Sequence, residues 1–250
     1  MARLHRAVRR LGVTLGVVAV LTVGLPAAPA QAPSPDRLEL GLVAIEAQIG
    51  DDVVRSSGTV IDTDDGLILT AAHSIWGAKT LRLSTGVGVL HGRIVGRAPC
   101  TDMALIETQP RIPGLATLTD TAGAAAPGEP LTAVARVGGA SGDRFASSAV
   151  AAGARLVPGS TVFDGRGQVV GIVAHWAPAS VVPWTTVRTR LAELQPGAQR
   201  VYVGWRKQYR CAGELRAYAI AHHPGFRLRD ARLNAPLPAT RLRGTEELDR

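Results

Sequence analysis

Two polar residues, His73 and Asp102, have the types and surroundings that nucleophilic catalysis requires. His73 ends the segment 66–73 (GLILTAAH), and Asp102 begins the apolar segment 102–106 (DMALI). Each side chain adjoins a strand-like run, where burial of a polar group without a partner would be costly. A histidine that takes a proton and an aspartate that orients its imidazole are two members of a Ser/His/Asp triad. A lone histidine is more often structural, but the paired segments favour hydrolase chemistry here.

Short apolar runs must position these side chains. From Leu38 onward such runs alternate with Gly, Asp and Pro, which is typical of an all-β sandwich or a pair of barrels. The sequence 64–66 (DDG) predicts a hairpin. A helix is expected over 185–194 and another over 214–221, a strand over 201–205, and irregular chain from Pro224. The other expected strands are 41–49, 57–62, 67–72, 80–84, 91–96, 103–107, 130–136, 147–152, 162–163 and 168–174.

Several motifs follow one another in a recognisable order over residues 38–195. They are SGTVI at 57–61, GLILTAAH at 66–73, GRIVGR at 92–97, TDMAL at 101–105, PGEP at 127–130, FDGRGQVVGI at 163–172 and VP at 182–183. In these motifs the chain resembles the trypsin-like serine peptidases of bacterial HtrA type. The resemblance implies a chymotrypsin-like double β-barrel with the active site between the barrels and a C-terminal helix. No PDZ-like extension is evident after Gln195, and an extra basic C-terminal segment follows instead.

The chain departs from this family at the nucleophile. Family members carry Gly-x-Ser-Gly-Gly-Pro or Gly-x-Ser-Gly-Ser-Pro, whereas residues 156–162 read LVPGSTV. An alignment without a gap puts Pro158 at the nucleophile position, and proline has neither a hydroxyl nor a backbone N–H. The other alignment makes Ser160 the nucleophile in a shorter turn without the glycines that follow it. Ser160 is otherwise a turn serine bonded to nearby backbone.

Two functions follow from these alternatives. In the first, the chain is an exported serine endopeptidase in which Ser160 attacks, His73 is the general base and Asp102 orients it. In the second, it is a pseudoprotease that binds a peptide or protein partner without cutting it. The similar segment 139–143 (GASGD) precedes the expected strand pair, and we interpret it as a hairpin turn.

The N-terminal thirty residues have the order of a secretory signal peptide: arginines, an apolar run, then small residues. The apolar run of about fifteen residues is shorter than a membrane-spanning helix needs. Cleavage after Ala30 would leave a peptidase-like domain at 31–198 and a basic extension at 199–250, in a secreted or periplasmic protein without stable membrane insertion. An uncleaved membrane anchor is the alternative.

The remaining composition gives weaker signals. Part of the formal charge of +8 belongs to the leader, and Pro, Ala and Leu interleave the C-terminal arginines, so no nucleic-acid partner is expected. His175, His222 and His223 have no carboxylate or cysteine at metal-ligand spacing, so neither a metal nor another cofactor is expected. Cys100 and Cys211 either form a disulfide, which export permits, or remain free.

Overall fold

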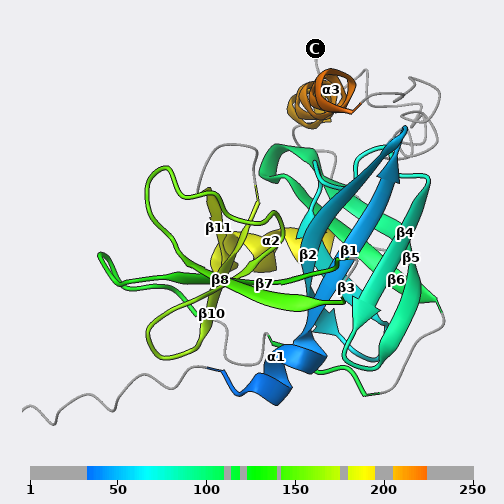
Figure 1. Ribbon diagram of the computed structural model, residues 1–250. Coiled ribbons are helices and arrows are strands. Elements are labelled where there is room, and N and C mark those ends of the chain that lie inside the picture. Colours follow the sequence, from blue (N-terminus) through cyan, green and yellow to red (C-terminus); the bar gives the residue numbers. More distant parts are fainter. Residues whose placement is uncertain are drawn as a thin grey trace, which may run out of the picture.

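A computed structural model describes residues 33–109, 114–118, 123–139, 142–174, 180–194 and 205–223 of the chain (Figure 1). The expected signal peptide, the sequence between 195 and 204, and the chain from Pro224 onward lie outside the described residues. The described residues form a closed antiparallel barrel, a second antiparallel sheet, and helices before and after the strands.

Six strands close the barrel in the order β1-β2-β3-β6-β5-β4. Tight turns connect its first strands. Ile49 pairs with Asp52 across the first turn, in which Gly50 has a φ of 60°. Gly66 likewise has a φ of 63° in the expected hairpin before β3. The strands are β1 (Leu42–Ile49), β2 (Asp52–Asp62), β3 (Leu67–Ala71), β4 (Thr80–Thr85), β5 (Gly88–Ala98) and β6 (Met103–Gln109).

The second sheet has five strands in the order β11-β10-β9-β7-β8. This order repeats that of β6-β5-β4-β1-β2 in the barrel. The barrel closes through β3, whereas no strand among the described residues has the corresponding place in the second sheet. The strands are β7 (Thr132–Val137), β8 (Arg144–Ala149), β9 (Thr161–Phe163), β10 (Val169–Val173) and β11 (Val181–Pro183).

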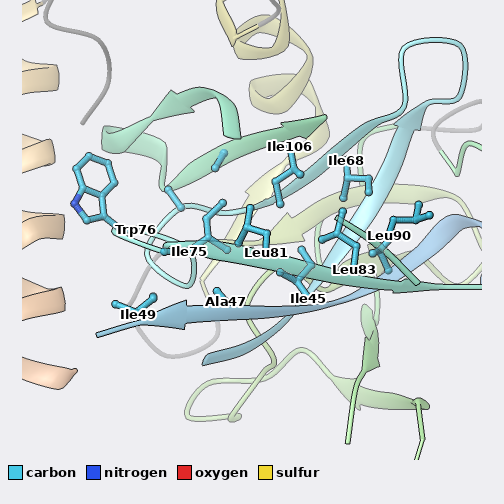
Figure 2. Packing of buried hydrophobic residues seen from close by; sticks show 14 of the residues in the cluster. Ile45, Ala47, Ile49, Ile68, Ile75, Trp76, Leu81, Leu83, Leu90 and Ile106 are labelled. Atoms are coloured by element: carbon cyan, nitrogen blue, oxygen red, sulfur yellow. The ribbon is translucent and has the colours of Figure 1, made fainter. Parts of the chain in front are cut away.

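Strands β3 and β6 are buried on both faces, so their side chains alternate between two cores. Ile68, Ala104 and Ile106 point into the barrel, where Ile45 and Leu83 join them (Figure 2). Their neighbours along the same strands point outward into a core that the barrel shares with the second sheet and α2. That shared core includes Leu67, Leu69, Met103, Leu105, Phe163, Val169, Ile172, Trp184 and Val187.

Three helices complete the described residues. Helix α1 (Pro35–Gly41) begins after Ser34, whose hydroxyl accepts a hydrogen bond from the backbone N–H of Arg37. Helix α2 (Trp184–Leu194) follows β11 directly. Helix α3 (Trp205–His222) lies across one end of the barrel (Figure 1), and a 3₁₀ turn, η1 (Pro99–Thr101), separates β5 from β6.

Most expected strands are present, but several boundaries were wrong. Strands β2 and β5 are longer than predicted because residues 52–56 pair with β1, residues 88–90 pair with β4, and residues 97–98 pair with β6. The second half of the β7–β8 hairpin begins at Arg144 rather than Ser147, and β11 was not predicted. Residues 35–41 form a helix that was not predicted, and Trp205 begins α3 rather than ending a strand.

Within the described residues, no helix combines the length and the apolar character needed to cross a membrane.

Candidate functional site

Strand pairing brings His73 and Asp102 together. Ala71 at the end of β3 pairs with Met103 at the start of β6, so the residues just beyond these strand ends are neighbours. The backbone N–H of Ala72 donates to the carbonyl of Asp102 at 2.8 Å, which extends this pairing by one step. The chain then turns at both ends, and His73 and Asp102 face each other there.

Asp102 holds both the backbone and the side chain of His73. One carboxylate oxygen, Oδ1, accepts the His73 backbone N–H at 2.7 Å, and Oδ2 lies 2.6 Å from the imidazole Nδ1. This second distance lies within hydrogen-bond reach, as expected from the sequence. Because a carboxylate accepts hydrogen bonds, this contact matches the tautomer with the proton on Nδ1, in which Nε2 is the nitrogen that can accept a proton.

The backbone of Asp102 is adapted to this position. It caps η1 in the left-handed conformation, with a φ of 52°, and its N–H donates to the carbonyl of Pro99. Aspartate tolerates this conformation better than most residues other than glycine. The residue has no exposed surface, so the bonds to His73 satisfy polar atoms that are removed from water.

Arg97 and Trp76 flank the two turns of the site. The Arg97 guanidinium carbon lies 5.4 Å from the centre of the Trp76 ring, a cation–π arrangement. Burial lowers the pKa of Arg97 to about 10. Its Nε and the Trp76 Nε1 are buried without a hydrogen-bond partner in the described structure.

Ser160 lies in a turn just before β9, and its hydroxyl is turned back onto that turn. The Ser160 Oγ donates to the carbonyl of Val157 at 2.6 Å, and the residue is only 2% exposed. Among the described residues, no hydrogen bond joins Ser160 to His73. The structure therefore brings His73 and Asp102 together. The third expected site residue, Ser160, instead bonds to the backbone of its own turn.

The backbone of the same turn is fastened to both sheets. The Ser57 N–H in β2 donates to the carbonyl of Pro158 at 2.9 Å, and the Gly159 N–H donates to Val173 in β10 at 2.7 Å. Gly159 has a φ of 77°, and a Cβ built on it would lie 1.9 Å from the Ser57 carbonyl oxygen. Only glycine fits this contact between the turn and β2.

The sequence did not predict that Tyr218 lies beside His73, and it did not decide whether Cys100 and Cys211 form a disulfide. The Tyr218 ring of α3 meets the imidazole edge-on, with ring centres 5.7 Å apart and planes at 80°. Cys100 and Cys211 form a disulfide, one of the two alternatives that the sequence left open. The position of Cys100 two residues before Asp102 was the available signal that α3 lies near the site.

The other histidines lie elsewhere or in different interactions. His222 Nδ1 lies 2.8 Å from the Tyr218 carbonyl oxygen, and His223 Nδ1 lies 3.4 Å from Asp52 Oδ2. His175 lies outside the described residues. Within the described part of the chain, no three His, Cys, Asp or Glu residues are grouped so that they could hold a metal ion.

No protein-family model matches this chain, and no curated protein matches it either.

Proposed function

We propose that this chain is a non-catalytic member of the trypsin-like serine peptidases, a pseudoprotease that binds an extended peptide or protein segment. Three features support the family: the ordered motifs, the closed barrel, and the His73–Asp102 pair at the ends of β3 and β6. The second sheet supports it too, because its order is that of the barrel without the strand equivalent to β3. In this proposal it is a second barrel reduced by one strand.

We infer the loss of catalysis from the hydrogen bonds that residues 158–160 make. A peptidase needs a free hydroxyl here and backbone N–H groups that point at the developing oxyanion. Pro158 has no N–H, Gly159 donates its N–H to Val173, and Ser160 donates both its N–H and its hydroxyl to Val157. This turn therefore offers neither a nucleophile nor an oxyanion donor.

The reduced second sheet gives a reason for this turn. In the barrel, β3 follows β2, whereas after β8 the chain runs through residues 150–160 directly into β9. That short connection carries the turn and leaves it fastened to Ser57 and Val173. We infer that two departures from the family pattern are linked. Among the described residues, the second sheet has no counterpart of β3, and the shorter connection before β9 alters the turn at residues 158–160.

A fluorophosphonate probe and an unfolded protein, β-casein, test the proposal. We expect the purified exported protein to bind β-casein in a titration, to produce no fragments, and to remain unlabelled by the probe. Labelling of the wild type that is lost in Ser160→Ala would contradict the proposal. Ser147→Ala, at an exposed serine of β8, is the matched control.

The intact His73–Asp102 pair favours a second candidate, a serine peptidase in which Ser160 attacks. That function requires Ser160 to leave the Val157 carbonyl when a substrate binds. Casein fragments that disappear in both His73→Ala and Ser160→Ala would establish it.

We propose that the protein acts after export, as a secreted or periplasmic protein. The order of charged, apolar and small residues in 1–30 supports export. Edman sequencing of the secreted form should begin at Gln31.

A further inference from the structure

One face of α3 is directed at the barrel end that holds His73. Cys211, Leu215, Tyr218 and Ala219 recur at the spacing that places residues on one side of a helix. Leu215 and Ala219 have no exposed surface, and both belong to the core cluster inside the barrel. The Trp76 ring, next to the orange turns of α3 in Figure 2, belongs to the same cluster.

The disulfide fastens this face beside the site. Cys100 lies in η1, the turn that Asp102 caps, so the bond to Cys211 begins two residues from the carboxylate. Tyr218 comes seven residues, or two helical turns, after Cys211 on the same face. The tether therefore determines where the Tyr218 ring lies.

Tyr218 covers the imidazole that a ligand would have to reach. Its ring packs edge-on against His73, whose side chain is only 9% exposed. A histidine that contacts or activates a bound peptide must present its Nε2 to that peptide. In this arrangement α3 occupies part of the space around the ring.

We propose that α3 is a built-in cover for His73, and that reduction of the Cys100–Cys211 bond by a dithiol releases it. The dithiol attacks one sulfur, becomes a disulfide itself, and passes two electrons and two protons to the two cysteines as thiols. Once the disulfide is cut, the described contacts of the α3 region are noncovalent: Leu215 and Ala219 are fully buried in the barrel core, Ala212 is partly buried against it, and His223 just after the helix lies 3.4 Å from Asp52. This inference rests on the proposed peptide-binding function and places the bound peptide beside His73 and Asp102.

Histidine modification by diethyl pyrocarbonate, mapped by mass spectrometry on the full exported protein, tests the cover. His91 is exposed on β5 and serves as the internal reference. We expect His73 to react about tenfold or more slowly than His91 in the oxidised protein, because modification requires a local opening. Reduction with dithiothreitol should bring the two rates close together. The measurement reports accessibility rather than binding or hydrolysis, so this inference and the proposed function can fail separately.

Variants distinguish the effect of the Cys100–Cys211 disulfide from that of the Tyr218 ring. Cys100→Ser combined with Cys211→Ser should expose His73 without a reductant, and Tyr218→Ala should expose it with the disulfide intact. Ala217→Ser, at an exposed position of α3, should leave the rate unchanged. Hydrogen exchange should show that amides of β3 and β6 stay protected in the reduced protein while those of α3 lose protection.

Three results would overturn the inference. They are equal reactivity of His73 and His91 in the oxidised protein, no change in the His73 rate on reduction, or loss of protection in β3 and β6 together with α3. The last result would mean that the disulfide holds the barrel itself rather than a cover.

Discussion

At the scale of single residues, the site consists of one strong arrangement and one altered position. Asp102 is completely buried, and it uses both carboxylate oxygens on His73. Charge-assisted bonds of this kind are short and costly to lose inside a protein. The Ser160 hydroxyl, by contrast, donates to Val157 in its own turn, and our proposal of binding rather than hydrolysis rests on this bond.

Asp102→Asn tests how firmly the pair is held. The amide oxygen can still accept the His73 backbone N–H, but the amide NH2 is a donor facing Nδ1, so the imidazole must either move its proton to Nε2 or leave an N–H without an acceptor in a buried place. We expect the free energy of unfolding to fall by about 1–3 kcal/mol in urea titrations. Asp62→Asn should change it by less than about 0.5 kcal/mol, because the more accessible Asp62 accepts one turn N–H, which asparagine can also accept. Equal effects of the two substitutions would contradict the special role of Asp102.

Arg97 gives a pH-dependent prediction. Burial lowers the pKa of Arg97 in the folded protein to about 10, so the unfolded chain binds this proton more tightly. The free energy of unfolding should therefore rise as the pH increases through that value. Arg97→Met removes the buried charge but keeps the bulk. We expect it to be more stable than the wild type by about 1 kcal/mol near neutral pH, after the loss of the Trp76 contact is included.

The advantage of Arg97→Met should shrink above about pH 10, where the wild-type guanidinium loses its proton. Urea titrations at several pH values measure it. Arg93→Met is the control, because Arg93 is exposed on the same strand and pairs with Glu107. An Arg97→Met advantage that grows with pH would mean that burial does not lower the pKa of Arg97.

At the scale of elements, the turn at residues 158–160 is held by bonds to neighbouring strands as well as by its own bonds to Val157. Its backbone donates to β10 and accepts from β2, and the hydroxyls of Thr59 and Thr161 lie 2.6 Å apart across the same junction. The turn therefore joins the barrel to the second sheet.

Gly159→Ala tests this junction. Gly159 and Gly128 have nearly the same φ, 77° and 76°, but nothing lies within 4 Å of a Cβ built on Gly128. Gly128→Ala should therefore cost only the backbone strain, about 1–2 kcal/mol. Gly159→Ala should cost at least about 2 kcal/mol more, because the Ser57 carbonyl must move. Equal losses in thermal or urea unfolding would show that the turn is not pressed against β2.

At the scale of the whole molecule, one core joins the two sheets and α2. Outward side chains of β3 and β6 meet Val169, Ile172 and Trp184 there, so the barrel and the second sheet cannot lose this core separately. We expect a single cooperative unfolding transition for these elements. The described part of the basic extension belongs to the same body, since Leu215 lies in the barrel core.

Val169→Ala measures this coupling. Val169 is fully buried in the shared core, and its truncation should lower the unfolding free energy by about 2 kcal/mol. Val89→Ala, at a side chain that is 53% exposed, should cost less than about 0.5 kcal/mol. Hydrogen exchange should show the same loss for amides of β3 and β10. A loss confined to β10 would mean that the two sheets unfold independently.

The sequence by itself determined the features that depend on local patterning. Alternation of apolar residues located most strands, and the turn at Asp64–Gly66 and the segments around His73 and Asp102 could be recognised because each lies within a few residues of its own strand. Strand boundaries were predicted less well, since the outer residues of β2 and β5 extend these strands by pairing with neighbouring strands. The local pattern also identified the altered turn at Pro158–Ser160.

The tertiary structure decided which groups meet across long stretches of chain. The disulfide joins cysteines 111 residues apart, and Tyr218 reaches His73 only because α3 folds back onto the barrel. The Ser160 hydroxyl itself bonds locally to Val157, but the place of its turn between the two sheets depends on the backbone bonds to Ser57 and Val173. A side-chain pattern reports which face of a strand is buried, whereas these contacts depend on how separate strands and helices pack in space.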